Sequence, residues 1–331
     1  MLSSAQLSCN IPFCKRREDG TNISEVCASH RYQTVDAMCA AHGPVSIPSC
    51  ILRFVPLQVR LKYFAVDIDG TFLAVDPEVY RRNVEAFVRV LESGVKIFFC
   101  TGRGHFGAIR EMPDEVIERL GFTGYPGIYH NGGAVYDEKG QLLEHALFDK
   151  TVLKRIIDKV VGCNHMKYTM FLTLDDWYII TDDRSFFNEF ITSLRLDRPF
   201  MRATAEEVLS MDIMKVIIVR YDLLAESFKD MRDVVFIAKR ALNDMTDLTP
   251  MGITKGSGLA LLLKSFGGSP DECGYIGDAC NDLEAMRLAG HSFAVGNAID
   301  EAKTAAKYVV QHTNDEGAFA RVMDAVFSPF L

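Results

Sequence analysis

The sequence predicts an α/β fold in which a doubly wound parallel-sheet core carries an inserted α+β cap domain. The first observation is an alternation of short apolar runs with amphipathic helical segments, which begins near residue 62 and resumes after residue 250. The second is a middle region with paired strand-like runs as well as helices. Because apolar strands separated by helices are typical of parallel sheets covered on both faces, the two outer regions are expected to form one core.

The outer regions supply the elements of this core in order. A strand is predicted over 62–66, a helix over 78–92 and a second strand over 95–100. The helix has apolar residues at helical spacing and is closed by Gly94. After Pro250 the sequence predicts helices over 257–266, 281–289 and 317–327 and strands over 273–276, 292–295 and 308–310.

The middle region is interpreted as a separate α+β unit. Asp175 and Asp176 lie between two strand-like runs and indicate a hairpin. The other predicted elements are helices over 152–161, 185–194 and 223–231 and strands over 168–174, 177–181, 214–220, 234–240 and 245–248. The expected organisation is a flexible extension over 1–60, a split core over 61–149 and 250–331, and a cap over 150–249.

Composition excludes several classes of protein. The formal charge of -8 argues against a general nucleic-acid or anionic-membrane binder, because both partners require a basic face. No window approaches the roughly 18 apolar residues of a membrane span, so a soluble protein is expected. Nine cysteines without a signal peptide predict reduced thiols and an intracellular, cytoplasmic location, with organelle targeting by residues 1–60 as the alternative. The oligomeric state is not predicted.

Two carboxylates follow the first predicted strand. Asp67 and Asp69 belong to the segment DIDGT at residues 67–71. Side chains at positions i and i+2 of an extended chain point the same way, so both can face one small volume before Gly70 turns the chain. Two anions that close repel each other, and a hard divalent cation such as Mg²⁺ is the usual neutralising partner. The alternative is a strand end followed by an ordinary turn.

Three further polar segments lie at strand ends or helix starts. Thr101, Gly102 and Arg103 follow a strand, and a hydroxyl beside a glycine N–H suits a phosphoryl group. Lys255 precedes a helix, where its ammonium can meet a phosphate. The segment GDACND at 277–282 ends another strand, and Asp278 within it can complete the metal site.

The ordered set DIDGT, TGR, a Lys-Gly and GDACND resembles the four motifs of the haloacid dehalogenase-like (HAD) superfamily of phosphohydrolases. About thirty residues separate the first two motifs, which leaves no room for a cap, whereas about 150 separate the second from the third. That placement is similar to the Cof-type sugar-phosphate phosphatases. The tracts at 128–135 and 250–256 also resemble segments that flank the cap in this subgroup.

The resemblance implies a role for each motif residue. Asp67 would attack phosphorus and form an aspartyl-phosphate, and Asp69 would protonate the leaving group and then activate water. Mg²⁺ would be held by Asp67, by Asp69 through its backbone carbonyl, and by Asp278. Lys255 and Thr101 would meet the remaining phosphoryl oxygens.

The resemblance also implies supporting residues. Gly102, Arg103, Asn131 and Asn281 are candidates for substrate binding. Asn281 and Asp282 would also hold the motif lysine and metal-bound water in place, with Asp282 in the second shell. Two of these have structural alternatives: Arg103 can pair with a surface acid, and Asn131 can serve only as a turn residue.

The implied function is a Mg²⁺-dependent phosphomonoesterase acting on small phosphorylated metabolites, with sugar phosphates favoured. Two alternatives stay open: a phosphosugar mutase of the same superfamily and a catalytically silent protein that binds a phosphorylated ligand. The cap is expected to set the substrate. Its candidate contacts, each more typical of the surface, are Lys167, Lys215, Arg220 and Asn243.

Overall fold

The computed structural model describes residues 61–187, 200–240 and 245–327. Its central element is a five-stranded parallel sheet in the order β14-β13-β12-β1-β2. The strands are β1 (Tyr63–Val66), β2 (Lys96–Phe99), β12 (Cys273–Gly277), β13 (His291–Ala294) and β14 (Tyr308–Val309). The predicted parallel core is therefore confirmed. The predicted extension over 1–60 lies outside the described residues.

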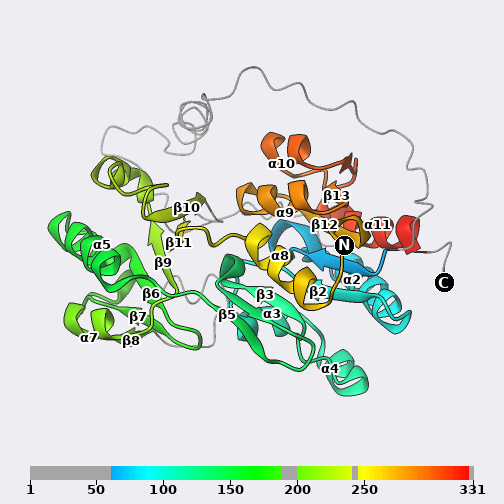
Figure 1. Cartoon of the computed structure of the whole chain (residues 1–331), viewed down its shortest axis with the longest axis horizontal. Coiled ribbons are helices and arrows are strands. Elements are labelled where there is room, and N and C mark those ends of the chain that lie inside the picture. Colours follow the sequence, from blue (N-terminus) through cyan, green and yellow to red (C-terminus); the bar gives the residue numbers. More distant parts are fainter. Residues whose placement is uncertain (1–60, 188–199, 241–244, 328–331) are drawn as a thin grey trace, which may run out of the picture. The chain divides into compact units, whose positions relative to one another are not determined.

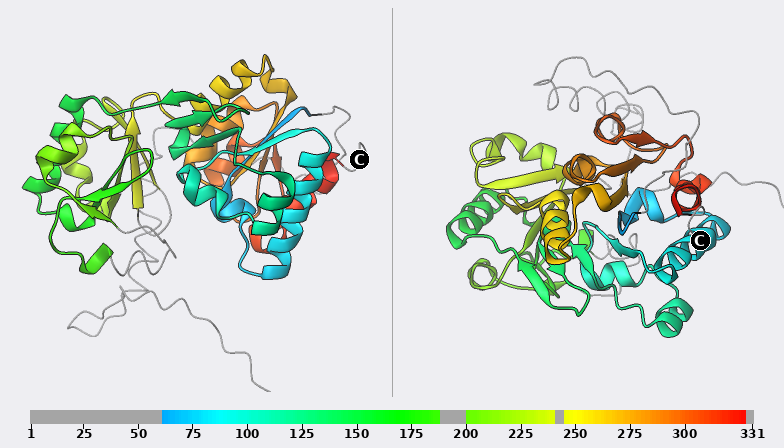
Figure 2. Two further views of the ribbon diagram at one scale, coloured as in Figure 1. Left: turned by 90° about the horizontal axis from the view of Figure 1, so that it is seen from below. Right: turned by 45° about the vertical axis from the view of Figure 1, so that its right-hand side comes forward.

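Helices cover both faces of this sheet, as Figures 1 and 2 show. Helices α2 (Pro77–Glu92) and α11 (Ala318–Phe327) pack together, as do α8 (Lys255–Ser265) and α9 (Leu283–Leu288). The remaining helices of this part are α3 (His105–Ile109), α4 (Asp114–Leu120) and α10 (Asp300–Ala305). Right-handed connections place helices on opposite faces when the chain moves in opposite directions from the sheet centre. The chain does so here, from β1 to β2 and from β12 to β13.

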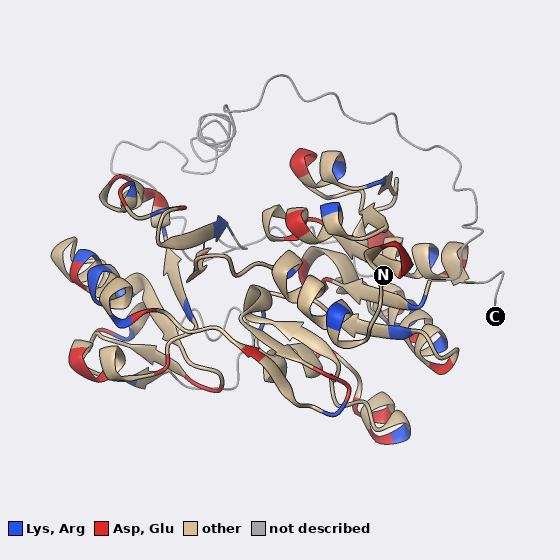
Figure 3. Ribbon diagram, viewed as in Figure 1, with Lys and Arg blue, Asp and Glu red and all other residues tan. Residues whose placement is uncertain are grey.

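Local sequence explains the start of α2. The Asp76 side chain accepts hydrogen bonds from the N–H groups of Glu78 and Val79, and Pro77 occupies the first turn, where its missing N–H costs nothing. The apolar face of the helix is buried against the sheet. At the surface, α2 carries both signs of charge, as do other helices in Figure 3.

A second sheet is formed by the middle of the chain. Its order is β10-β11-β9-β6-β7-β8, and all neighbours except β7 and β8 are antiparallel. The strands are β6 (Thr169–Leu172), β7 (Trp177–Ile179), β8 (Met201–Arg202), β9 (Lys215–Val219), β10 (Phe236–Arg240) and β11 (Met245–Pro250). Helices α5 (Lys150–Gly162) and α7 (Ala205–Ser210) belong to the same part. This is the predicted inserted cap, although its predicted boundaries at 150 and 249 stay a prediction.

One predicted element of the inserted part differs from the structure. The hairpin at Asp175 and Asp176 is confirmed by the pairing of β6 with β7. The helix predicted over 223–231 is wrong: two short 3-10 turns, Tyr221–Leu223 and Ala225–Phe228, replace it. Arg220 has left-handed backbone geometry (φ 57°), which ends β9 abruptly. The helix predicted over 185–194 runs into residues outside the described part.

A three-stranded antiparallel sheet was not predicted. It contains β3 (Gly127–Tyr129), β4 (Ala134–Tyr136) and β5 (Leu142–His145), and the tract at 128–135 forms its first turn. Strands of three or four residues are too short for a period to be read from the sequence. Among the described helices, none is long and apolar enough to cross a membrane.

The core of the parallel sheet centres on Phe72, whose side chain is fully buried. Its ring lies 5.1–6.2 Å from four others, those of Tyr80, Phe87, Phe99 and Phe319. We expect Phe72→Ala to lower the free energy of unfolding by about 3–5 kcal/mol, because it removes these contacts and leaves a cavity. Urea denaturation measures this change.

The control for this prediction is Phe106→Ala, since residue Phe106 is 46% exposed. We expect it to cost about 1 kcal/mol or less. Equal losses for the two variants would contradict the assignment of Phe72 to the centre of the core.

Candidate active site

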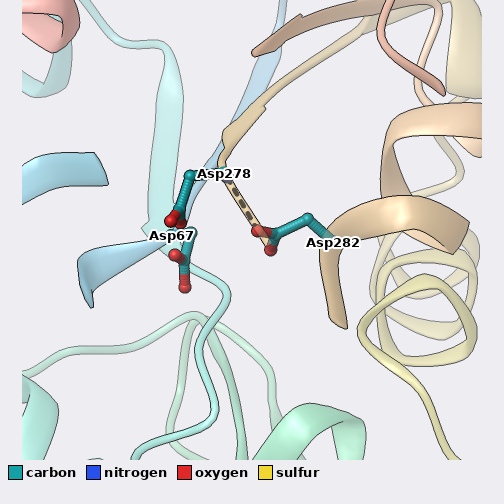
Figure 4. A group of neighbouring side chains, drawn as sticks. All are labelled: Asp67, Asp278 and Asp282. Carbon is teal, nitrogen blue, oxygen red and sulfur yellow. Dashed lines mark hydrogen bonds between the residues drawn. The ribbon is translucent and has the colours of Figure 1, made fainter. Parts of the chain in front are cut away.

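The predicted motif residues meet at the carboxyl ends of β1 and β12. These strands are neighbours and parallel, and the chain leaves them toward opposite sides of the sheet. Crevices in such sheets form where the strand order reverses, outside the carboxyl ends of the strands. Asp67 directly follows β1 and Asp278 directly follows β12. Figure 4 shows their carboxylates side by side, with Asp282 approaching from the following helical turn.

A buried ion cluster joins three of the motif residues. Lys255 is fully buried at the first position of α8, and its Nζ donates to Asp67 Oδ1 at 2.5 Å and to Asp282 Oδ1 at 2.6 Å. Asp282 also accepts from the Tyr275 hydroxyl and from the N–H groups of Asp278 and Ala279. The contact that the resemblance implied between Asp282 and the motif lysine is therefore present.

Asp278 lies against Asp67 through a shared hydroxyl. Thr71 Oγ1 is 3.1 Å from Asp278 Oδ1 and 3.4 Å from Asp67 Oδ2. Carboxylate oxygens of Asp67, Asp278 and Asp282 lie within 4.8 Å of one another. Gly70 permits this approach, because its φ of 74° is left-handed and a Cβ there would lie 2.5 Å from Asp278 Oδ2.

Burial and like charge shift the pKa values in this cluster. Burial raises the pKa of Asp278 to about 7, and the Asp282 carboxylate adds to the effect. Burial also raises the pKa of Asp67 well above its ordinary value, against the opposing charge of Lys255. Burial alone disfavours a charged lysine, but the carboxylates of Asp282 and Asp67 raise the pKa of Lys255, which stays protonated.

The donor set fits a hard divalent cation. When its three carboxyls are ionised they face one ammonium, so the cluster then carries an excess of negative charge that a cation would offset. Asp282 has its oxygens engaged by Lys255 and backbone N–H groups, which leaves Asp67 and Asp278 as the side chains best placed to hold the cation. The participation of the Asp69 carbonyl stays a prediction.

The loop after β2 lies beside this cluster. Thr101 is fully buried, and its Oγ1 accepts from the Arg103 N–H at 3.1 Å, so the hydroxyl hydrogen remains available as a donor. Within the described part of the chain, the Gly102 N–H has no acceptor. A free N–H beside a hydroxyl donor is the arrangement that binds phosphoryl oxygens.

Asp69 and Arg103 form a bidentate ion pair. Arg103 Nε and Nη2 donate to the two carboxylate oxygens of Asp69 at 2.8 and 2.7 Å, and Nη1 also contacts Glu111. The alternative role predicted for Arg103 is pairing with an acidic residue. Arg103 does pair with two, Asp69 and Glu111, and Asp69 is the residue predicted to transfer the proton. Substrate binding by Arg103 stays a prediction.

The structure adds Asp247 to the predicted set and pairs it with Lys215, one of the candidate cap contacts. Both are buried, Lys215 at 4% and Asp247 at 5% exposure, and they form an ion pair at 3.0 Å. The surface expectation for Lys215 is therefore wrong. Asn131 Nδ2 donates to Asp247 Oδ2, and Asn281 Nδ2 donates to Asn131 Oδ1. Among the described contacts Asn281 thus reaches Asn131, where the resemblance had implied a contact with the lysine.

Other cap candidates lie elsewhere. Lys167 and Arg220 both place their charges over the Tyr168 ring, and Asn243 lies outside the described residues. No signal in the sequence pointed to Asp247, which sits in the middle of a strand pattern.

Comparisons with known proteins agree with this geometry. A family model described as haloacid dehalogenase-like hydrolase matches residues 64–323. The chain belongs to this family. A solved HAD/COF-like hydrolase from Plasmodium vivax is 28% identical, with a TM-score of 0.74, and the match covers 82% of this chain and 97% of that one. The predicted family, fold class and class of enzyme are confirmed.

Two curated relatives of this HAD-like chain differ in length. It is 28% identical over 282 residues to the chloroplastic endoribonuclease YBEY of Arabidopsis thaliana, a match covering 81% of this chain but 46% of the relative. It is 25% identical over 293 residues to a 5-amino-6-(5-phospho-D-ribitylamino)uracil phosphatase of Bacillus subtilis, covering 81% of this chain and 99% of the relative. The chain thus spans less than half of the plant relative and nearly all of the bacterial one.

The buried residue His130, next to the site, is expected to make the stability of the fold depend on pH. His130 is 2% exposed, and burial, together with the charge of Lys215, lowers its pKa to about 3. The unfolded imidazole binds a proton below about pH 6.5, whereas the folded one does not until about pH 3, so acid favours unfolding in this window.

We therefore expect the wild type to lose about 1.4 kcal/mol of stability per pH unit more than His130→Gln as the pH falls below 6.5. Urea denaturation at pH 7.5, 6.0, 5.0 and 4.5 measures both proteins. Above pH 7 the two curves should run parallel. Parallel curves over the whole range would rule out a buried neutral His130.

Proposed function

We propose that the chain is a Mg²⁺-dependent phosphomonoesterase that hydrolyses small phosphorylated metabolites, with sugar phosphates favoured, through an aspartyl-phosphate on Asp67. The observation that carries the proposal is the Asp67 carboxylate at the end of β1, bound by Lys255 and adjacent to Asp278. The phosphatase names of bacterial relatives, among them an HMP-PP phosphatase of Serratia proteamaculans, support the substrate class. The chloroplastic plant relative supports organelle targeting as the alternative location.

In the first step an Asp67 carboxylate oxygen attacks phosphorus. A new P–O bond forms to Asp67 while the bond to the leaving alkoxide breaks, and Asp69 supplies the proton that the alkoxide takes. In the structure the Asp69 carboxyl is bound by Arg103, so proton transfer requires Asp69 to exchange that partner for the substrate. Thr101 and the Gly102 N–H orient the phosphoryl oxygens by donating to them.

In the second step water attacks the phosphorus of the aspartyl-phosphate. Asp69 takes the proton from the water, the bond between Asp67 and phosphorus breaks, and inorganic phosphate leaves. Lys255 stays charged throughout and balances the carboxylate that Asp67 regains. Asp67 and Asp278 would hold a divalent cation, which would supply the charge neutralisation that lets two anionic groups approach each other.

The first test is a panel of phosphorylated metabolites with Mg²⁺ and with a chelator. We expect phosphate release that stops with the chelator and that falls at least about a thousandfold in Asp67→Asn, because the amide is a poor nucleophile. Asp324→Asn is the matched control, since Asp324 is an exposed residue of α11 that pairs with Arg89. Turnover that survives in Asp67→Asn would falsify the aspartyl-phosphate route.

The second test separates the two roles of Asp69. We expect Asp69→Asn to slow hydrolysis of an alkyl phosphate by about 10²-fold or more, because the alkoxide needs a proton as it leaves. An aryl phosphate with an acidic leaving group needs no such proton, so formation of its phospho-enzyme should be much less affected. Burst kinetics with p-nitrophenyl phosphate measures that step alone. An equal loss for both substrates in the first step would exclude the acid role.

A further inference from the structure

A buried ion pair of the inserted sheet contacts residues of the parallel-sheet part of the chain. Lys215 begins β9 and Asp247 lies in β11, the neighbouring antiparallel strand. Asp247 is directly opposite Ile217, so Lys215, two residues earlier, projects from the same face. Their side chains are 5% and 7% exposed. Burying two charges costs several kcal/mol per ion unless further hydrogen bonds satisfy them.

Those further hydrogen bonds go to residues of the predicted phosphate site. Lys215 Nζ donates to the Gly102 carbonyl at 2.8 Å, and Asn131 Nδ2 donates to Asp247 Oδ2 at 2.8 Å. Asn281 Nδ2 then donates to Asn131 Oδ1 at 3.1 Å. One chain of polar contacts therefore runs from the inserted sheet to the loop after β2 and to the fourth motif.

The chemistry of the donors and acceptors fixes the direction of each hydrogen bond in this series. The Asp247 carboxylate, paired with a lysine, can only accept, so the Asn131 side chain must turn its NH₂ group toward it. The Asn131 side-chain carbonyl then faces Asn281, and Asn281 must donate to it from its own NH₂ group. Asp247 thus fixes the orientation of two amides that could otherwise flip.

Lys215 fixes the peptide on the other side of Gly102. The Thr101 carbonyl accepts from the Asn131 backbone N–H at 3.0 Å, which sets the peptide that carries the free Gly102 N–H. The next peptide is held at both ends, its carbonyl by Lys215 and its N–H by Thr101 Oγ1. Without Lys215 the Gly102 carbonyl loses its donor, and the Gly102 loop loses one of the hydrogen bonds that hold it in place.

We propose that Asp247 and Lys215 are positioning residues for phosphoryl binding: Asp247 orients the amides of Asn131 and Asn281, and Lys215 holds the Gly102 loop. The proposal rests on the proposed function, because it assigns these contacts to the same site. Neither residue is required to touch the reacting atoms.

A second ion pair between the inserted sheet and the core supplies the control. Lys239 on β10 donates to Glu284 on α9 at 2.7 Å, and within the described part of the chain neither side chain forms a hydrogen bond with the Gly102 loop or Asn131. If the Lys215–Asp247 pair only fastened one part of the molecule to the other, loss of the Lys239–Glu284 pair should have a comparable effect on ligand binding.

The experiment measures the Kd of inorganic phosphate by calorimetry in the presence of Mg²⁺, and kcat and KM for a substrate from the panel. The variants are Asp247→Leu, which removes the acceptor oxygen shared by Asn131 and Lys215, Lys215→Met, the double variant and Lys239→Met. Thermal unfolding checks that each is folded. The double variant contains no unpaired buried charge, so it provides the answer if a single variant does not fold.

We expect phosphate binding to weaken about tenfold or more in Asp247→Leu and in Lys215→Met, and no more than about twofold in Lys239→Met. The double variant should resemble the weaker-binding single variant, because both changes break one network. KM should follow the phosphate Kd.

Folded double-variant protein that binds phosphate with the wild-type Kd overturns the inference, and so does an equal loss in Lys239→Met. If the wild type hydrolyses substrates while these results hold, only the positioning role is wrong. A wild type that neither binds phosphate nor releases it from any substrate overturns the proposed function together with the inference.

Discussion

The burial of the Lys255 ammonium between Asp67 and Asp282 is the interaction on which the rest of the site depends. Removing three charges from water is expensive, and such a cluster persists only when its donors and acceptors are matched. Asp282 is matched completely by Lys255, Tyr275 and two backbone N–H groups. Asp67 and Asp278 are not, because one lysine cannot balance three carboxylates. The unsatisfied half of the cluster is the half that can attract a cation, and a bound cation would then let an anionic phosphoryl group approach.

The sheet brings these residues together by its topology. The two aspartates are 211 positions apart in the sequence, yet β1 and β12 are hydrogen-bonded neighbours that end at the same edge. Sequence reasoning reaches this result because each motif is local: an apolar run followed by carboxylates marks a strand end, and parallel strands end together. The fold class, the elements near 62–100 and 273–295, and the grouping of Asp67, Lys255 and Asp278 follow from that logic.

The same logic does not reach Asp247 or Lys215. Both lie inside or at the start of strands of the antiparallel sheet, where a polar residue normally marks a solvent-facing position. Asp247 contacts Asn131, which lies 116 residues earlier, and no local pattern of apolar and polar residues predicts such a tertiary contact. Lys215 looks like a surface residue for the same reason. The helix expected over 223–231 is wrong for a different reason. After the left-handed Arg220 the chain forms two separate turns, which bury Leu224 and Phe228 but leave Leu223 exposed.

A stability argument does not explain why an ion pair is buried on the inserted sheet. A well-packed apolar pair at positions 215 and 247 is expected to be neutral or more stabilising, because a buried ion pair gains little over its desolvation cost. Unlike apolar groups, a carboxylate can only accept hydrogen bonds and an ammonium can only donate them. Each therefore fixes how its hydrogen-bonding partner is oriented. Here the pair orients the side chains of Asn131 and Asn281 and holds the Gly102 carbonyl. The pair is therefore best understood through the groups that it orients, and those groups border the proposed phosphate site.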